Sequence, residues 1–189
     1  MFTRVVSWLA ALLLFSAPVL AEPAKWQVDP AKSSLSFVVD VNGQTVTGKF
    51  KAFGAIIAFD PADLAHSSAK ITIDMTEAKS GDATRDAMLL KPDWFNVLDF
   101  PQAIFQTTGF TSKGGNAYEA KAKLTLKGAT KDVVLPFTLA ITGDTAVANG
   151  EVRLKRTEFK VGQGGQFETE KPVALGVKVL VNVTAKRVN

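Results

Sequence analysis

The carboxyl-terminal segment of the chain alternates between apolar and mostly polar residues, and this period of two constrains the fold more than any other feature. The apolar positions are Leu175, Val177, Val179, Val181, Val183 and Ala185. Side chains in a β-strand point alternately to opposite faces, so the segment predicts a strand with one apolar face and one solvated face. The same alternation recurs in residues 35–41, 71–75, 118–126 and 133–141. The chain therefore predicts a sheet that hides one face from water.

The hidden face contains almost no group capable of acid, base or nucleophilic chemistry. Its predicted members are aliphatic and aromatic side chains, as in Val133, Leu135, Phe137, Leu139 and Ile141. This composition favours a protein that holds an apolar molecule over one that transforms a substrate.

Residues 1–21 are typical of an export signal. Arg4 precedes an apolar run from Val5 to Leu14, and Pro18 interrupts the segment before Ala21. The run is too short to span a bilayer comfortably, so we expect cleavage near Ala21 rather than a membrane anchor. The remaining residues, 22–189, are enough for a single domain with a sizeable core.

Charge and cysteine content exclude several classes of protein. The chain has no cysteine, so packing alone must hold the exported domain, and no thiolate can bind a metal. The formal net charge of +4 is spread over alternating positions, with no basic run of the kind that nucleic-acid-binding proteins show. We expect neither a nucleic-acid partner nor a metal site.

Strand-like segments joined by short turns cover most of residues 26–187. Asn42-Gly43 predicts a hairpin turn, followed by one long strand from Gln44 to Phe59 in which Gly48 and Gly54 mark a bend or bulge. We predict an all-β fold, a lipocalin-like antiparallel barrel of about eight strands, because closure removes exposed sheet edges. A barrel of eight strands is either filled by its own side chains or holds one slender ligand.

A short helical insertion, at about residues 82–98, interrupts the strands. Ala83, Ala87 and Leu90 have helical spacing, Asp82 is placed to cap the helix, and Pro92 suits the start of a second short turn. The insertion is rich in large apolar side chains, among them Trp94 and Phe95.

Three charged residues of this insertion share one helix face. Asp82, Arg85 and Asp86 are at spacings i, i+3 and i+4. They have a structural interpretation, as a capped helix start with a paired arginine, and a functional one, with Arg85 at the barrel mouth receiving the polar end of a ligand. A glycosidase-like carboxylate pair is a third interpretation, disfavoured because neither carboxylate has an apolar setting. The single histidine, His66, lies in an expected surface turn, and we predict no catalytic role for it.

Several motifs together resemble the YceI-like family. They are Trp26-x-x-Asp29-x-x-x-Ser33-x-Leu35-x-Phe37, Gly48-x-Phe50, Phe59-Asp60-Pro61, Arg85-Asp86-x-x-Leu89, Trp94-Phe95, Phe100-Pro101-x-x-x-Phe105, Leu124-Thr125-Leu126-x-Gly128-x-Thr130-Lys131 and Arg156-x-x-Phe159. The resemblance implies a lipocalin-like barrel in the bacterial periplasm, with an elongated apolar channel for polyisoprenoid or other long-chain lipids.

The chain departs from this family at two positions. Met88 stands where many members have histidine, and Asp40 to Gly43 stand where many have another. Together with the Gly162-Gln163-Gly164 stretch, these departures resemble a branch often found with b-type cytochromes of the membrane. This resemblance implies a quinone as one cargo to consider and such a cytochrome as a partner.

We predict a non-enzymatic periplasmic carrier, monomeric or homodimeric, that holds a polyisoprenoid, an isoprenoid quinone or a fatty-acid-like chain without a cofactor. The alternatives are a stress-protection or interaction module without internal cargo, and a hydrolase acting on lipid phosphates or carbohydrate. The predicted ligand-binding residues are Phe37, Val39, Val41, Phe50, Ile73, Met75, Arg85, Met88, Leu89, Trp94, Phe95, Phe137, Leu139, Val179 and Val181.

Overall fold

The computed structural model describes residues 22–188, so the predicted export signal lies outside the described residues. Its strands are β1 (Lys25–Val28), β2 (Ser34–Val41), β3 (Gln44–Phe50), β4 (Phe53–Ala58), β5 (Ser68–Asp74), β6 (Ala78–Lys79), β7 (Gln102–Gly114), β8 (Ala117–Leu126), β9 (Ala129–Thr142), β10 (Thr145–Lys155) and β11 (Gly176–Val188). The helices are α1 (Ala83–Leu89) and the short 3-10 helices η1 (Pro30–Lys32), η2 (Met75–Glu77), η3 (Arg156–Phe159) and η4 (Gly165–Glu168).

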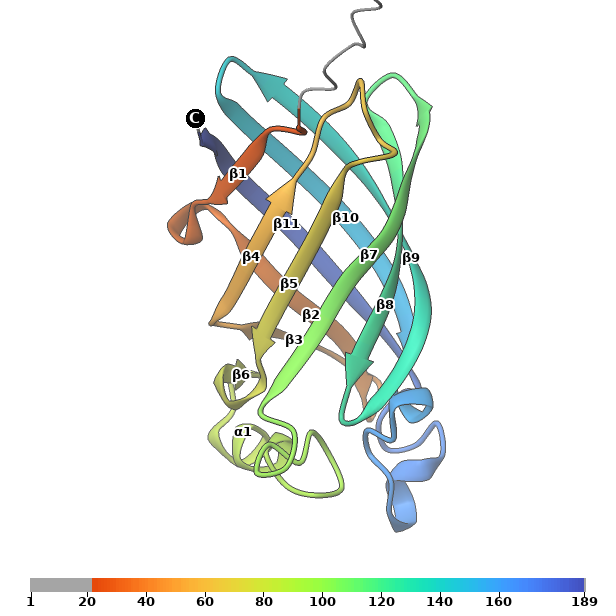
Figure 1. The fold of residues 1–189 in the computed structure, drawn as a ribbon. Coiled ribbons are helices and arrows are strands. Elements are labelled where there is room, and N and C mark those ends of the chain that lie inside the picture. The colour runs from red at the N-terminus through yellow and green to blue at the C-terminus, as the bar shows by residue number, and fades with distance from the viewer. Residues whose placement is uncertain (1–21, 189) are drawn as a thin grey trace, which may run out of the picture.

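Eight of these strands form a closed antiparallel circuit. The order is β1, β4, β5, β7, β8, β9, β10 and β11, and β11 pairs again with β1 (Figure 1). Closure satisfies the backbone groups at what would otherwise be sheet edges. The structure confirms the predicted all-β, lipocalin-like barrel with a short helical insertion.

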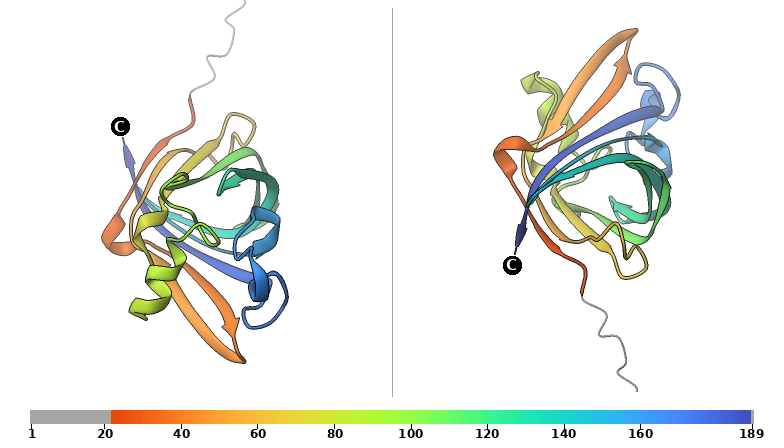
Figure 2. Two further views of the ribbon diagram at one scale, coloured as in Figure 1. Left: turned by 90° about the horizontal axis from the view of Figure 1, so that it is seen from below. Right: turned by 90° about the horizontal axis from the view of Figure 1, so that it is seen from above.

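Two different strands pair with successive parts of one edge of β11. Residues 185–188 pair with β1, and residues 178–182 pair with β2. Strand β2 then turns back into β3, and this hairpin projects beside the lower end of the barrel (Figure 2). The turn is Asn42-Gly43, where both residues have positive φ (53° and 80°), as its sequence predicts.

The predicted long strand from Gln44 to Phe59 is wrong, because it divides into β3 and β4 at Lys51 and Ala52. Gly48 marks no bend and lies inside β3, directly opposite Phe37 of β2. A Cβ atom at Gly48 would lie 2.0 Å from Cζ of Phe37, so the ring needs a glycine beneath it. The inward ring of Phe37 thus explains why residue 48 is a glycine.

The insertion begins as predicted and ends its helix earlier. Oδ1 of Asp82 accepts the backbone N–H of Arg85 at 2.9 Å, and α1 stops at Leu89. Pro92 then starts a series of turns up to Phe100. Viewed from below, this segment and the loops that follow η3 both lie across the lower end of the barrel (Figure 2).

The contact between Gly48 and Phe37 gives a test with a matched control. Gly48→Ala should lower the free energy of unfolding by about 1–3 kcal/mol, because the added methyl group overpacks the ring of Phe37. Gly54→Ala, in β4, the next strand along the chain, should not destabilise the protein, since an added Cβ meets no atom within 4 Å there. Urea unfolding of both variants measures the difference. Equal midpoints would show that the Phe37 ring moves aside without cost.

Candidate ligand cavity

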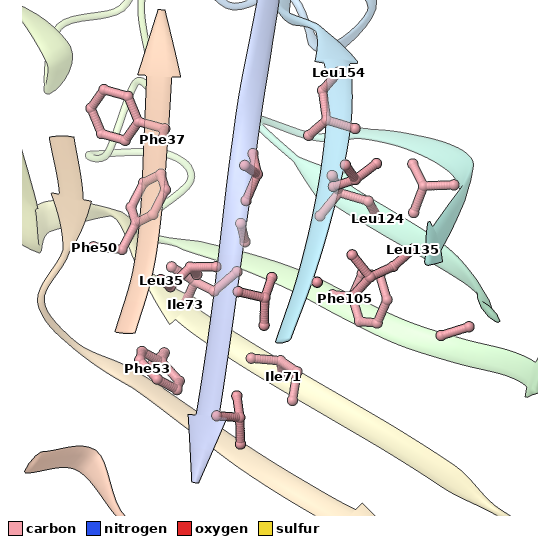
Figure 3. A pocket seen from close by; sticks show the side chains of 18 of the residues that line it. Leu35, Phe37, Phe50, Phe53, Ile71, Ile73, Phe105, Leu124, Leu135 and Leu154 are labelled. Atoms are coloured by element: carbon pink, nitrogen blue, oxygen red, sulfur yellow. The ribbon is translucent and has the colours of Figure 1, made fainter. Parts of the chain in front are cut away.

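The barrel encloses a cavity of about 310 Å³. Its wall is made of the inward side chains of the strands, and Ala148 and Gly150 of β10 are among its small members. Figure 3 shows Leu35, Phe37, Phe50 and Phe53 on one side of this space, and Leu124, Leu135, Leu154 and Phe105 on the other. The interior of the eight-stranded barrel is therefore partly empty.

Most of the predicted ligand residues line this one cavity. They are Phe37, Val39, Phe50, Ile73, Met75, Leu89, Trp94, Phe95, Phe137, Leu139, Val179 and Val181. The period of two in the strands and the aromatic residues of the insertion place them correctly. The cavity wall also includes aromatic residues that the sequence prediction left out, such as Phe59, Phe105 and Phe110.

Three predicted residues do not line the cavity. Val41 lies next to the hairpin tip, where it forms a bridge with Val173 and packs against the lower core. Met88 lies on the outer side of α1 with 38% of its surface exposed. Arg85 turns back to Ser80, where Nε donates to Oγ at 3.3 Å and Nη2 donates to the carbonyl oxygen at 3.4 Å. Arg85 therefore does not line the cavity, and its predicted contact with the polar end of a ligand stays a prediction.

The polar groups at the cavity wall already have partners in the protein. The indole N–H of Trp26 donates to the carbonyl of Phe59 at 2.9 Å, and the hydroxyl of Thr107 donates to the carbonyl of Ala69 at 3.2 Å. Within residues 22–188, no buried side-chain nitrogen or oxygen lacks a hydrogen-bond partner. The wall therefore favours hydrocarbon ligands over polar ones. A polar ligand would lose its hydrogen bonds to water and would find no free partner in the wall to replace them.

The upper end of the cavity is filled by an aromatic cluster. Phe59 is 6% exposed and makes edge-to-face contacts with Phe110 and Tyr118, at centroid distances of 5.0 and 5.7 Å. The ring of Tyr118 stacks on Phe137 at 5.5 Å. Trp26 packs in the same cluster. These rings, called here the upper plug, separate the cavity from solvent at that end.

The lower end is filled by side chains of the insertion and of the segment after β10. Trp94, Phe95, Phe159, Val161 and Val173 are each at most 8% exposed and belong to one core cluster. The indole ring of Trp94 also contacts Phe167 edge to face at 5.3 Å. These residues form the lower plug, so two segments far apart in sequence close one end of the barrel.

Arg156 organises the lower plug and was not predicted as a site residue. Its side chain is 4% exposed, and all its nitrogen donors bind backbone carbonyl oxygens. Nε donates to Ala174 at 3.0 Å, Nη1 donates to Val161 and Gly162 at 3.0 and 3.1 Å, and Nη2 donates to Phe167, Thr169 and Val173. The guanidinium lies over Trp94, with Cζ 5.8 Å from the ring centroid.

Burial lowers the pKa of the Arg156 guanidinium, while nearby Glu170 opposes this shift. Arginine nonetheless stays protonated, because its ordinary pKa lies far above neutral pH. Its five N–H groups are fully used by the carbonyls, so Arg156 holds the loop and has no donor left for a ligand. Gly162 allows this packing, since a Cβ there would lie 2.3 Å from Nη1 of Arg156.

A sequence signal for Arg156 was present in the alternation of β10. Ala146, Ala148, Gly150, Val152, Leu154 and Arg156 occupy successive inward positions and all line the cavity. A charged residue in an apolar inward series must be paired or hydrogen-bonded. The pattern therefore marks Arg156, although its carbonyl partners could not be assigned from sequence.

The acidic residues of the insertion support local structure outside the cavity wall. Oδ1 of Asp86 accepts the backbone N–H and the hydroxyl of Ser80 at 2.6 and 2.8 Å. These hydrogen bonds lower the pKa of Asp86, which is the opposite of what a general acid at neutral pH needs. His66, which is exposed, pairs with Asp63 at 2.8 Å.

Within residues 22–188 there is no group of three or more His, Cys, Asp or Glu side chains that could hold a metal ion. No helix in the same range is long and apolar enough to cross a membrane.

The hydrogen bonds of Arg156 predict a strong effect of substitution. Arg156→Met should lower the free energy of unfolding by more than about 3 kcal/mol, since hydrogen bonds from a charged group contribute about 1.5–3 kcal/mol each. The loop at residues 160–175 should become sensitive to limited proteolysis. Arg153→Met, which removes a mostly exposed arginine three residues earlier, should change stability by about 0.5 kcal/mol or less. A resistant loop in the Arg156 variant would contradict this role.

Comparison with known proteins places these features in a family. The YceI-like domain description matches residues 26–186. Protein YceI of Escherichia coli O157:H7 is 30% identical over 164 residues, covering 82% of this chain and 85% of its own length. A UPF0312 protein of Photorhabdus laumondii is 30% identical over 163 residues, covering 82% and 84%.

Solved structures agree with the sequence comparison. Burkholderia cenocepacia BcnA is 36% identical, with a TM-score of 0.81, covering 85% of this chain and all of that one. A polyisoprenoid binding domain from Saccharophagus degradans shares the fold at 13% identity, with a TM-score of 0.70 and coverage of 87% and 99%. On these matches, the chain belongs to the YceI-like family.

Proposed function

We propose that this protein is a periplasmic carrier that binds one long apolar lipid inside its barrel. The ligand class comprises polyisoprenoids, isoprenoid quinones and fatty-acid-like chains. The observation that carries the proposal is the apolar cavity inside the barrel, whose polar wall groups already have hydrogen-bond partners. The polyisoprenoid-binding neighbour of the same fold is consistent with this class of ligand.

Apolar burial supplies the free energy that such binding needs. Removing hydrocarbon from water contributes about 25 cal/mol per Å², so burying about 400 Å² of a lipid chain would contribute about 10 kcal/mol before ordering costs. Met75, which is 2% exposed and lines the cavity, adds a flexible and polarisable wall suited to more than one chain. Met88 is on the outer side of α1 and adds nothing here.

The arrangement of charged groups supports a binding role over hydrolysis. Asp82 caps α1, Asp86 holds Ser80, and neither carboxylate lines the cavity. A module without cargo is disfavoured because an internal cavity leaves side chains without packing partners, which costs stability unless a ligand fills it. The periplasmic location, a membrane b-type cytochrome as partner, and a monomeric or homodimeric state stay predictions from the sequence.

Bound lipid should be detectable directly. Native mass spectrometry of protein exported by a bacterial host and purified without detergent should show a mass added to the chain. Organic extraction should release a molecule with a long hydrocarbon chain. Ligand-free protein that also fails to bind added prenyl alcohols would contradict the proposed function.

A bulky substitution separates a ligand cavity from a packed core. Val181→Trp should weaken binding of geranylgeraniol at least tenfold, because the indole occupies cavity volume, while changing stability by less than about 1 kcal/mol. In a fully packed core the same change would overpack and destabilise by about 1–3 kcal/mol. Val134→Trp is the matched control, since Val134 is 46% exposed, and it should leave binding unchanged. Binding that survives Val181→Trp would place the ligand outside the barrel.

A further inference from the structure

One stretch of the barrel wall is closed by side chains and not by a backbone ladder. Strand β4 pairs with β1 at two positions, Ala58 with Lys25 and Ile57 with Trp26. The rest of β4, from Phe53 to Ile56, pairs only with β5. Strand β2 pairs with β11 and β3. Among the described strands, the edge of β4 that faces β2 is therefore unpaired over these residues.

A cleft of about 530 Å³ lies against this stretch of wall. Four residues line both the cleft and the internal cavity: Ser34 and Leu35 of β2, Phe50 of β3 and Phe53 of β4. The three apolar side chains among them, called here the seam, therefore lie between the two spaces. Figure 3 shows all three beside the cavity.

The seam differs from the lower end of the barrel in what holds it closed. Its side chains belong to the same core cluster as the lower plug, but only the lower plug is also held by the hydrogen bonds of Arg156. At the seam, rotation of three side chains would join the cleft to the cavity without breaking a ladder hydrogen bond. Such rotations are fast and small compared with the opening of a sheet.

The charges around the cleft favour an anion. Lys49 and Lys51 line it, and neither forms an ion pair with any residue in 22–188. Lys49 is also directly opposite Lys79 in the β3–β6 ladder, and facing like charges are unfavourable. The one carboxylate of the cleft, Asp74, uses Oδ1 to accept the N–H and hydroxyl of Thr76 at 2.9 and 2.6 Å. An anion bound beside both lysines would balance this excess of positive charge.

We propose that the cleft binds the anionic head group, a phosphate or a carboxylate, of an amphiphile whose tail lies in the internal cavity. The tail passes the seam between Leu35, Phe50 and Phe53, and the head group stays outside, next to Lys49 and Lys51. This arrangement spares the head group from burial in the apolar interior, where a charge is costly. The inference rests on the proposed function, because it needs an apolar tail in the barrel.

The test compares two ligands that share one tail. Geranylgeranyl monophosphate and geranylgeraniol are titrated against the wild-type protein and the Lys49→Gln/Lys51→Gln variant at low ionic strength, with tryptophan fluorescence as the readout. The wild type should bind the phosphate at least tenfold more tightly than the alcohol. The double variant should reduce this preference to less than threefold and leave the affinity for the alcohol unchanged.

A matched control removes two lysines elsewhere on the barrel. Lys70→Gln/Lys121→Gln changes two exposed residues on the outer face of β5 and β8 and causes the same loss of charge. It should keep the tenfold preference, which separates a local site from a general effect of net charge. As a second readout, bound phosphate should protect Lys49 and Lys51, but not Lys70 and Lys121, from acetylation by acetic anhydride, followed by peptide mass spectrometry.

The outcomes separate this inference from the proposed function. Equal affinity of the wild type for both ligands, or a preference that survives in the Lys49→Gln/Lys51→Gln variant, would overturn the head-group site and leave lipid binding intact. An equal loss of preference in the control variant would likewise overturn it. If neither ligand binds the wild-type protein, the proposed function and the head-group site both fail.

Discussion

Closure of eight antiparallel strands is the constraint on which the rest of the structure depends. Once the circuit from β1 to β11 is closed, every second side chain of each strand is directed into one confined volume. The size of the inward side chains then decides which parts of that volume are filled and which stay empty. Aromatic residues of the upper plug fill one end, whereas aliphatic side chains and small residues such as Ala148 line the cavity in the middle. The cavity therefore follows from the distribution of large and small residues within a single alternating pattern.

Arg156 shows how an apolar barrel can tolerate one buried charge. Arg156 is the first residue of η3, directly after β10, and continues the inward series of that strand where the chain turns back towards β11. Chain segments that leave a sheet carry carbonyl groups without ladder partners, and Arg156 gathers six of them. The carbonyl groups of the loop thus accept the hydrogen bonds that the buried guanidinium needs, and the guanidinium supplies the donors that these carbonyl groups lack. Because the loop contributes Val161 and Val173 to the lower plug, the same hydrogen bonds also keep the cavity closed.

The sequence was sufficient for the fold and for most of the cavity wall, because both depend on local alternation. Phe37, Val39, Phe137, Leu139, Val179 and Val181 face inward because strands have a period of two, whatever their partners. The errors concern properties set by distant contacts. Gly48 was interpreted as a bend, but it accommodates a ring from a neighbouring strand. Arg85 was expected to receive a ligand but does not line the cavity, and Arg156 was left out, because a guanidinium's role depends on which carbonyls and hydroxyls surround it in three dimensions.

The barrel has an asymmetry that is relevant to how it exchanges a ligand. Around most of the circuit, the wall is a continuous ladder, and admitting a hydrocarbon there would require breaking several backbone hydrogen bonds at once. Between β2 and the start of β4 there is no backbone ladder, and Leu35, Phe50 and Phe53 complete the wall there. These side chains close the wall through apolar contacts with one another. A hydrocarbon tail that passes between them makes apolar contacts of the same kind in their place. Exchange along this route keeps the closed circuit intact, so the strands that define the cavity need not separate when it is filled or emptied.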